Sequence, residues 1–503
     1  MLTQRRSGIL LHPTSLPGSQ HCGSLGVEAR NFIDLIAGCG QSVWQVLPLN
    51  PTGHGNCPYS CFSAFAGNPL LINLIALTEV GDLTKPDLPV PAPATDQANF
   101  AAAMRDQYPL LRRAWENFQR NAGTERRARF MEFCTEQSYW LDDYALFETL
   151  RANQGQRPWH DWPEPLRQRD PATLARCLND FSADIHWHKY MQYIFYEQWF
   201  ALTSYARQQG VRIMGDLPIF VAENSADVWS HRELFHLDEQ GRATLVAGVP
   251  PDYFSATGQR WGNPLYCWER LRDQDFSWWR KRFAWNFKMF DLLRVDHFRG
   301  FSACWAIPAA DQTAENGYWL ATPGRELFIR LQQDHGDLPI LAEDLGIITA
   351  DVVELRQEFA LPGMKILQFA FDSGADNPYL PHNHSTDAAV YTGTHDNDTS
   401  LGWWHHLDAG GRERVKDYLR RPCQEMPWPL IETALASVAR LAIIPLQDIL
   451  ALPSTARMNT PGTATGNWSW RYQKNHLEER ICERLRHATH LYGRDLCFHT
   501  EIT

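Results

Sequence analysis

Four acidic residues stand where short apolar runs end, and they are the best candidates for chemistry in this sequence. They are Asp216 in "GDLPIF", Asp296 in "LLRVDHFRG", Glu343 in "LAEDLG" and Asp396 in "TGTHDND". A single acid at such a position is commonly a helix cap. Four like charges close together repel one another, so a protein selected for stability alone would not gather them. Arg294 stands two residues before Asp296, and His395 stands next to Asp396. Clustered carboxylates of this kind mark functional sites.

Clustered carboxylates without a phosphate-binding loop or metal-ligand histidines suit two chemistries. One is the binding of a divalent cation, which prefers oxygen ligands. The other is glycoside chemistry, in which one carboxylate attacks the anomeric carbon and another protonates the leaving oxygen. Aromatic residues among Gly and Pro in 55–69 and 250–268 offer flat faces for sugar rings. The sequence therefore favours a sugar substrate, and we predict no metal site.

Eight apolar runs followed by polar or Gly- and Pro-containing sequence are predicted to be buried strands. They lie at 7–15, 42–51, 211–220, 292–300, 338–346, 364–372, 388–398 and 441–450. Stretches with helical spacing alternate with them, such as 28–40, 188–210 and 350–360. This alternation is typical of an α/β protein with a parallel sheet, and eight strands close a (β/α)8 TIM barrel. The strand ends, and with them the four acids, would then meet on one face of the barrel.

We expect one catalytic barrel over residues 1–503 with two inserted subdomains. The segment 75–187, between the second and third strands, is too long for a loop and has helical patterns, so we predict a largely helical insertion. The segment 222–290, between the third and fourth strands, is rich in Gly, Pro and aromatic residues. We predict that it forms a loop-built lid.

The composition narrows the setting in which the protein works. Hydrophobic residues make up 44% and charged residues 21%, as in ordinary globular proteins, and the net charge of −11 argues against a nucleic-acid partner. The eleven scattered cysteines lack zinc-ligand spacing and fit a reduced, cytoplasmic protein. No run approaches the roughly 18 apolar residues that a membrane span needs, and the N-terminal sequence lacks a signal-peptide core.

Six segments in order carry a family resemblance that extends from "GILLHPTSLPG" to "RMNTPGTATGNWSWR". They are "PYSCFSAFAGNPLLI", "GDLPIFV", "PPDYFSATGQRWGNPLY", "RVDHFRGF", "AEDLG" and "TGTHDND". Together they resemble the amylomaltases or disproportionating enzymes, 4-α-glucanotransferases that are related to the α-amylases. The resemblance implies a catalytic (β/α)8 barrel with inserted subdomains and no obligatory cofactor. It also implies that maltooligosaccharides or other α-1,4-glucans are both donor and acceptor.

The resemblance also implies roles for individual residues. Asp296 would be the nucleophile that forms a covalent glucosyl intermediate, Glu343 the general acid and then base, and Asp396 a residue that holds sugar hydroxyls and stabilises the transition state. Arg294 would bond the nucleophile and keep it ionised. The remaining substrate-binding residues would be Tyr59 under the reacting sugar, His395 on one of its hydroxyls, Asp216 in support, and Tyr253, Phe254, Gln259 and Trp261 over the acceptor.

The loop "GHGNCPY" departs from the usual family pattern. Asn56 and Cys57 stand where members usually have Ser, often after Asp. His54 stands where some relatives place an aromatic residue on a secondary glucan-binding surface. We therefore expect the sugar contacts of this loop to differ, and a free Cys beside the site to be open to oxidation.

Three functions are compatible with these residues. The first is a 4-α-glucanotransferase that works by a retaining double displacement, with the Asp296 and Glu343 carboxyls about 5–5.5 Å apart. The second is a hydrolase or phosphorylase of the same superfamily, which would share the carboxylates. The third is a barrel that only binds glucan. Binding alone would not require that Asp296, Glu343 and Asp396 be kept together with Arg294 and His395. We expect the first; the sequence leaves open whether the protein is a monomer or a homodimer.

Overall fold

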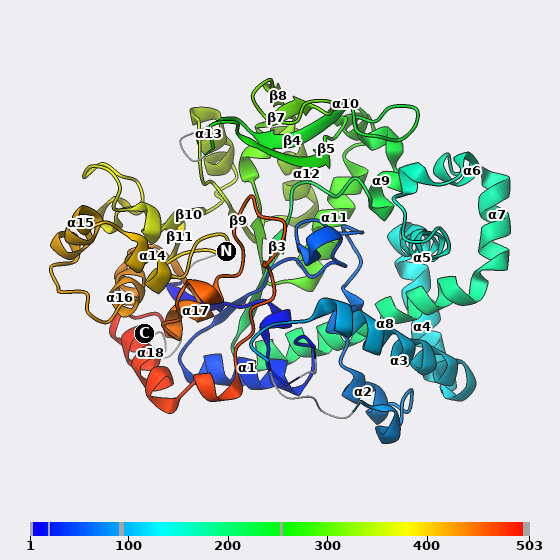
Figure 1. Cartoon of the computed structure of the whole chain (residues 1–503), viewed down its shortest axis with the longest axis horizontal. Coiled ribbons are helices and arrows are strands. Elements are labelled where there is room, and N and C mark those ends of the chain that lie inside the picture. Colours follow the sequence, from blue (N-terminus) through cyan, green and yellow to red (C-terminus); the bar gives the residue numbers. More distant parts are fainter. Residues whose placement is uncertain (1–3, 19–20, 90–94, 252–254, 496–503) are drawn as a thin grey trace.

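Eight parallel strands form the central sheet of the computed structural model, which describes residues 4–18, 21–89, 95–251 and 255–495 (Figure 1). In chain order they are β1 (Arg6–Leu10), β2 (Val43–Gln45), β3 (Arg212–Leu217), β6 (Leu292–Val295), β9 (Ile340–Ala342), β10 (Gly363–Ile366), β11 (Ala388–Tyr391) and β12 (Leu441–Pro445). Their spatial order is β10-β11-β12-β1-β2-β3-β6-β9. The Ala342 N–H, at the end of β9, donates to the Pro362 carbonyl just before β10 at 2.9 Å. The sheet is thus a nearly closed barrel, and the predicted (β/α)8 fold is confirmed.

Most strand residues are apolar and buried because helices cover the barrel from outside. In β6, for example, Leu292, Leu293 and Val295 are at most 1% exposed. The helices α1 (Val27–Gly38), α8 (Ser182–Gln208) and α13 (Ala350–Glu358) lie at the positions predicted from helical spacing. No described helix is long and apolar enough to cross a membrane.

Helices fill most of the chain between β2 and β3. They are α2 (Leu74–Glu79), α3 (Phe100–Asn121), α4 (Thr124–Glu136), α5 (Ser138–Asn153), α6 (Glu164–Arg167) and α7 (Pro171–Asp180). Figure 1 shows α3 to α7 gathered on one side of the barrel against α8. Aromatic rings join them to that helix: Phe118 of α3, for example, lies 5.2 Å from Tyr190 of α8, measured between ring centroids.

The segment 222–290 is more regular than the loop-built lid that we expected. It contains α9 (Ala226–Ser230), β4 (Leu245–Val249), β5 (Gln259–Pro264), α10 (Trp268–Asp273) and α11 (Ser277–Met289). The strands β4 and β5 join β7 (Ala303–Pro308) and β8 (Tyr318–Ala321), which follow β6, in an antiparallel sheet of order β5-β4-β7-β8. The insertion therefore combines two stretches of chain on either side of β6, and its sheet lies beyond one end of the barrel (Figure 1).

The loop 55–69, which carries Tyr59, is held at its C-terminal end by α8. The Gln192 side chain is fully buried; its Oε1 accepts the Gly67 N–H at 2.7 Å and its Nε2 donates to the Gly67 carbonyl at 2.9 Å. A Cβ at position 67 would lie 2.0 Å from the Phe195 ring, so this close approach requires glycine. The same helix thus feeds β3 and anchors a loop of the site.

We predict that Gln192→Ala destabilises the protein far more than Gln198→Ala. Gln198 makes the same pair of bonds to the Asn73 backbone, at 2.8 and 3.1 Å, but is only partly buried. Removing Gln192 leaves two buried backbone groups unpaired, which costs about 2–4 kcal/mol, whereas water can replace Gln198 at a cost of about 1 kcal/mol or less. Urea unfolding of the two variants measures the difference. Equal losses would contradict the proposed anchoring of Gly67.

Candidate active site

Arg294 in β6 joins two of the predicted acids at the end of the barrel. Its Nη1 donates to both Asp216 carboxylate oxygens at 2.8 Å, and its Nη2 lies 3.0 Å from Asp296 Oδ1. The pairing of β3 with β6 sets Asp216 and Arg294 directly opposite each other, so that their side chains leave the same face of the sheet. Burial lowers the pKa of Arg294, but the two carboxylates more than reverse this, and the net pKa is raised well above its usual value. The guanidinium therefore stays charged although it is only 4% exposed.

Glu343 follows β9 and is bound to the turn that begins at Asp296. The Glu343 N–H donates to the Val295 carbonyl at 3.0 Å, and the Phe298 N–H donates to the Glu343 carbonyl at 3.1 Å. The carboxyl itself accepts the His297 N–H on Oε2 at 2.6 Å and the Leu345 N–H on Oε1 at 3.1 Å. The backbone thereby fixes Glu343 beside Asp296.

The surroundings of Glu343 favour its neutral form. Burial is the main cause and raises the pKa of Glu343 to about 7, with a further contribution from the negative charge of Asp296. Arg294 and the two backbone N–H groups oppose the shift. The protonated carboxyl therefore persists to a higher pH than is usual for a glutamate.

Asp396 and His395 lie across the site, where β11 ends. His395 Nε2 is 3.3 Å from Asp396 Oδ2, and Asn459 Nδ2 donates to Asp396 Oδ1 at 2.6 Å. Burial alone would lower the pKa of His395, yet Asp396 raises it overall. Burial alone would raise the pKa of Asp396, yet His395 and Asn459 hold it well below its usual range. The two residues therefore form an ion pair.

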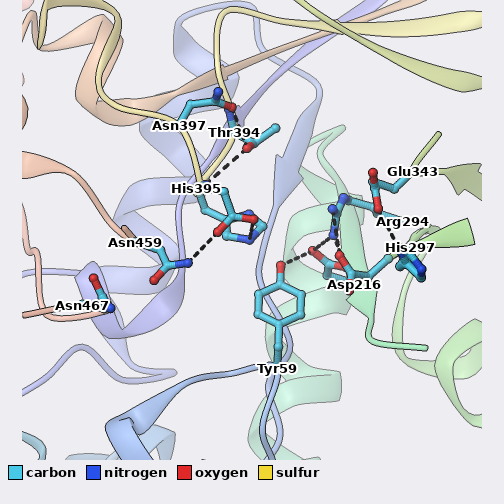
Figure 2. Close-up of polar contacts among 12 residues, drawn as sticks. Tyr59, Asp216, Arg294, His297, Glu343, Thr394, His395, Asn397, Asn459 and Asn467 are labelled. Atoms are coloured by element: carbon cyan, nitrogen blue, oxygen red, sulfur yellow. Dashed lines mark hydrogen bonds and ion pairs between the residues drawn. The ribbon is translucent and has the colours of Figure 1, made fainter. Parts of the chain in front are cut away.

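Tyr59 bridges the two halves of the site. Its hydroxyl donates to Asp216 Oδ2 at 2.7 Å, and its ring stacks on the His395 imidazole with centroids 5.0 Å apart and planes inclined by 13°. Trp468 lies beside both rings, at 5.9 Å from Tyr59 and 5.8 Å from His395. Figure 2 shows Tyr59 between His395 on one side and Asp216 with Arg294 on the other.

The sheet insertion brings Gln259 and Trp261 of β5 to the edge of this site. The Trp261 indole N–H donates to Gln259 Oε1 at 3.2 Å, and the Trp261 ring meets the His297 ring edge-on with centroids 4.8 Å apart. Trp261 keeps 39% of its surface exposed. Tyr253 and Phe254 lie outside the described residues.

The predicted set is therefore brought together by segments that are far apart in the chain. Within the described residues, a continuous series of contacts links Asp396, His395, Tyr59, Asp216, Arg294 and Asp296, and Glu343 joins it through the backbone N–H of His297, the residue after Asp296. The sequence analysis missed Asn459, Trp468 and the backbone N–H of His297. The first two lie in the C-terminal segment "RMNTPGTATGNWSWR", where a polar, Gly-rich loop that also contains Trp was the available signal.

Cys57 is less reactive than its position beside the site suggested. Burial is the main cause that raises the pKa of its thiol to about 11, and Asp296 and Asp396 act in the same direction. The thiol is protonated at neutral pH, and it is the thiolate that reacts with oxidants. The neighbouring Asn56 adopts a left-handed conformation with φ 57°.

The arrangement suits glycoside chemistry better than cation binding. No group of three or more His, Cys, Asp or Glu in the described parts of the chain could hold a metal ion. Asp296 is instead paired with an arginine, and Glu343 is a carboxyl that carries a proton near neutral pH. A nucleophile and a proton donor are the two groups that retaining glycoside chemistry requires.

Comparison with known proteins decides the family. The sequence model described as 4-alpha-glucanotransferase matches residues 11–477. The chain belongs to the 4-alpha-glucanotransferase family. It is 49% identical to the 4-alpha-glucanotransferase of Thermus thermophilus over 96% of this chain and 97% of that protein. It is 48% identical to the Synechocystis enzyme of the same name over the full length of both.

A solved structure agrees with this family. The amylomaltase from Streptococcus agalactiae, in complex with acarbose, superposes with a TM-score of 0.95 at 38% identity over 98% of this chain and all of that one. The resemblance to the amylomaltases and the enzyme class expected from the motifs are therefore confirmed.

The pKa of Glu343 predicts the pH dependence of activity. A general acid must be protonated, and this carboxyl loses its proton as the pH rises through about 7. We expect kcat/KM to fall above about pH 7, by about tenfold for each further pH unit. Initial rates on a maltooligosaccharide from pH 5 to pH 9 measure this alkaline limb of the pH profile, the fall of kcat/KM above about pH 7. A fall of kcat/KM that begins near the usual carboxyl pKa, or no fall up to pH 9, would contradict the assignment of the catalytic proton to Glu343.

Proposed function

We propose that this enzyme transfers a segment of an α-1,4-glucan to the 4-hydroxyl of an acceptor glucan or of glucose, with retention of configuration. The observation that carries the proposal is the pair of unlike carboxyls, Asp296 on the Arg294 guanidinium and Glu343 with its raised pKa, held by one backbone turn. An amylomaltase of similar fold was solved with acarbose bound, which supports a glucan-like ligand for this chain.

In the first displacement, Asp296 attacks the anomeric carbon of the donor. The bond to the leaving O4 breaks, and Glu343 gives its proton to that oxygen. The product is a glucosyl ester on Asp296 and a shortened glucan. In the second displacement, Glu343 takes the proton from the acceptor 4-hydroxyl, whose oxygen attacks the same carbon and releases Asp296. Two inversions give net retention.

The other residues of the site have supporting roles in this proposal. Arg294 is the counter-ion of the Asp296 carboxylate, with its Nη2 3.0 Å from Oδ1. The ion pair of His395 and Asp396 offers both a donor and an acceptor to the hydroxyls of the reacting sugar. Tyr59, supported by Asp216, provides the aromatic face under that sugar.

Transfer requires that an acceptor glucan reach the intermediate before water does. In this proposal, Trp261 binds an acceptor ring and shields the ester. Its exposed surface and its contact with the His297 ring, next to Asp296, support this role. Tyr253 and Phe254 are proposed to act with Trp261.

The ten described cysteines are all free, which fits a reducing compartment, and we propose that the enzyme works in the cytoplasm.

Incubation with maltotriose tests the proposed reaction. A transferase gives glucose together with chains longer than the substrate, whereas a hydrolase gives only shorter pieces and a binding protein gives none. Asp296→Asn is the matched control, because a neutral amide cannot replace the anion as nucleophile. We expect its transfer activity to fall at least about 10⁴-fold while the fold is retained. Only shorter products from the wild type, or residual activity near wild type in the variant, would overturn the proposal.

We further predict that Trp261→Ala shifts the balance from transfer to hydrolysis. Losing a stacking face worth about 1 kcal/mol weakens acceptor binding about fivefold, so the ratio of free glucose to transferred product should rise by about that factor. Trp261→Phe, which retains a ring, should lie close to the wild type. If total activity fell while the ratio stayed fixed, Trp261 would not serve the acceptor.

A further inference from the structure

The turn that carries the nucleophile is also bound to the far end of the segment that carries Glu343. Arg299 lies in the short helix η7 (Phe298–Phe301), three residues after Asp296. Its Nη1 donates to the Ile347 carbonyl at 2.8 Å and to Thr349 Oγ1 at 3.0 Å. The side chain is 7% exposed. This charged group is buried beside the active site, and the mechanism above does not use it.

The antiparallel sheet holds the same guanidinium from its other side. The Arg299 guanidinium carbon lies 3.9 Å from the centroid of the Trp319 ring in β8. Trp319 in turn meets Trp305 of β7 edge-on at 5.1 Å. The planar guanidinium is therefore stacked on an aromatic face and bonded to the segment 347–349, a combination that lysine cannot reproduce.

The middle of the segment between Glu343 and Thr349 is open to solvent, although Leu345 and Ile348 pack against the hydrophobic core. Gly346 is exposed with φ 82°, and Ile347 is 51% exposed. The segment is fixed at its start, where Glu343 bonds to the backbone of Val295 and Phe298, and at its end by Arg299. Between these points, the Leu345 N–H donates to the Glu343 carboxyl. Asp344 also holds the segment, by accepting the Met364 N–H at 2.7 Å and by lying 3.3 Å from Arg356 Nε, so the contacts of Arg299 are the ones that hold its far end.

We propose that Arg299 is a positioning residue for the general acid: by holding Ile347 and Thr349 against η7, it keeps the segment 343–349 closed over Glu343 and keeps water from that carboxyl. Trp319 holds Arg299 in place and connects the acid to the sheet that bears Trp261. The inference rests on the proposed function, in which Glu343 is the acid.

The sign of the effect follows from the groups that face Glu343. Arg294 and Asp296 face it from the end of β6 and His297 faces it from the following turn, while Tyr379, beyond β10, is also within its electrostatic reach. These groups stay in place when the segment loosens, whereas the hydration of Glu343 changes. Because burial is the largest cause of its raised pKa, entry of water lowers the pKa. Loss of the Leu345 N–H bond acts in the opposite direction but is the smaller effect.

The test compares Arg299→Lys with the matched control Arg325→Lys. Arg299 binds the residues just before α13, and Arg325 binds the end of the same helix through an exposed ion pair with Glu358 at 2.6 and 2.9 Å. Surface ion pairs of this kind contribute little to stability. We expect Arg299→Lys to move the alkaline limb of kcat/KM at least about 1 pH unit lower and to lower kcat about tenfold, since small displacements of catalytic groups are costly. KM should change less than about twofold, because Arg299 contacts no group assigned to the sugar. Arg325→Lys should match the wild type in the position of the alkaline limb, in kcat and in KM.

Trp319→Ala provides a second route if Arg299→Lys fails to fold. It should shift the limb in the same direction, and hydrogen exchange at the Leu345 amide should be faster in both variants. An alkaline limb that stays at its wild-type position in the folded variants overturns the inference, whether or not kcat falls, because a merely structural residue would lower kcat without moving the limb. The proposed function would fail separately, through the absence of longer chains from maltotriose with the wild-type enzyme.

Discussion

The site depends on a buried arginine that is shared by two carboxylates. Arg294 and Asp216 are almost completely buried, and together with Asp296 they place one positive and two negative charges at the mouth of the barrel. Buried charges are tolerated only when their partners are close and well aligned. Nη1 of Arg294 contacts both Asp216 carboxylate oxygens at 2.8 Å, which meets this requirement and restricts the orientation of the guanidinium. Its Nη2 then lies 3.0 Å from Asp296 Oδ1, so the Asp296 carboxylate is positioned by a contact that the barrel strands impose.

This constraint gives the two carboxyls unlike surroundings. Asp296 has the arginine beside it and is partly open to solvent, whereas Glu343 lies against backbone N–H groups in more desolvated surroundings. Opposite environments for two acids are the basis of acid and nucleophile assignments in enzymes generally. The turn of residues 296–299 contributes to both, since its backbone binds Glu343 and its Arg299 binds the segment beyond. The fold thus links the two acids through one backbone turn; burial, and to a lesser degree the charge of Asp296, raises the pKa of Glu343.

The sequence was most informative where local pattern and tertiary structure agree. The eight barrel strands are short apolar runs that end in polar residues, and the acids that we predict to be catalytic stand at those ends, so the strands and the position of these acids at the mouth of the barrel could be predicted. The sheet β5-β4-β7-β8 could not, because β4 reads "LVAGV" with a Gly in it, β5 reads "QRWGNP", and their partner β7 lies beyond β6. Asn459 and Trp468 were missed for a related reason: their roles come from a loop that returns to the site from the C-terminal part of the chain, and no local pattern encodes that return.

Neutron diffraction of the substrate-free enzyme near pD 6 tests the central claim most directly, because it locates the protons on both acids. The account predicts a deuteron on the Glu343 carboxyl, none on Asp296, and a fully charged Arg294 between Asp296 and Asp216. A deuteron on Asp296, or a bare Glu343 carboxylate at that pD, would contradict it.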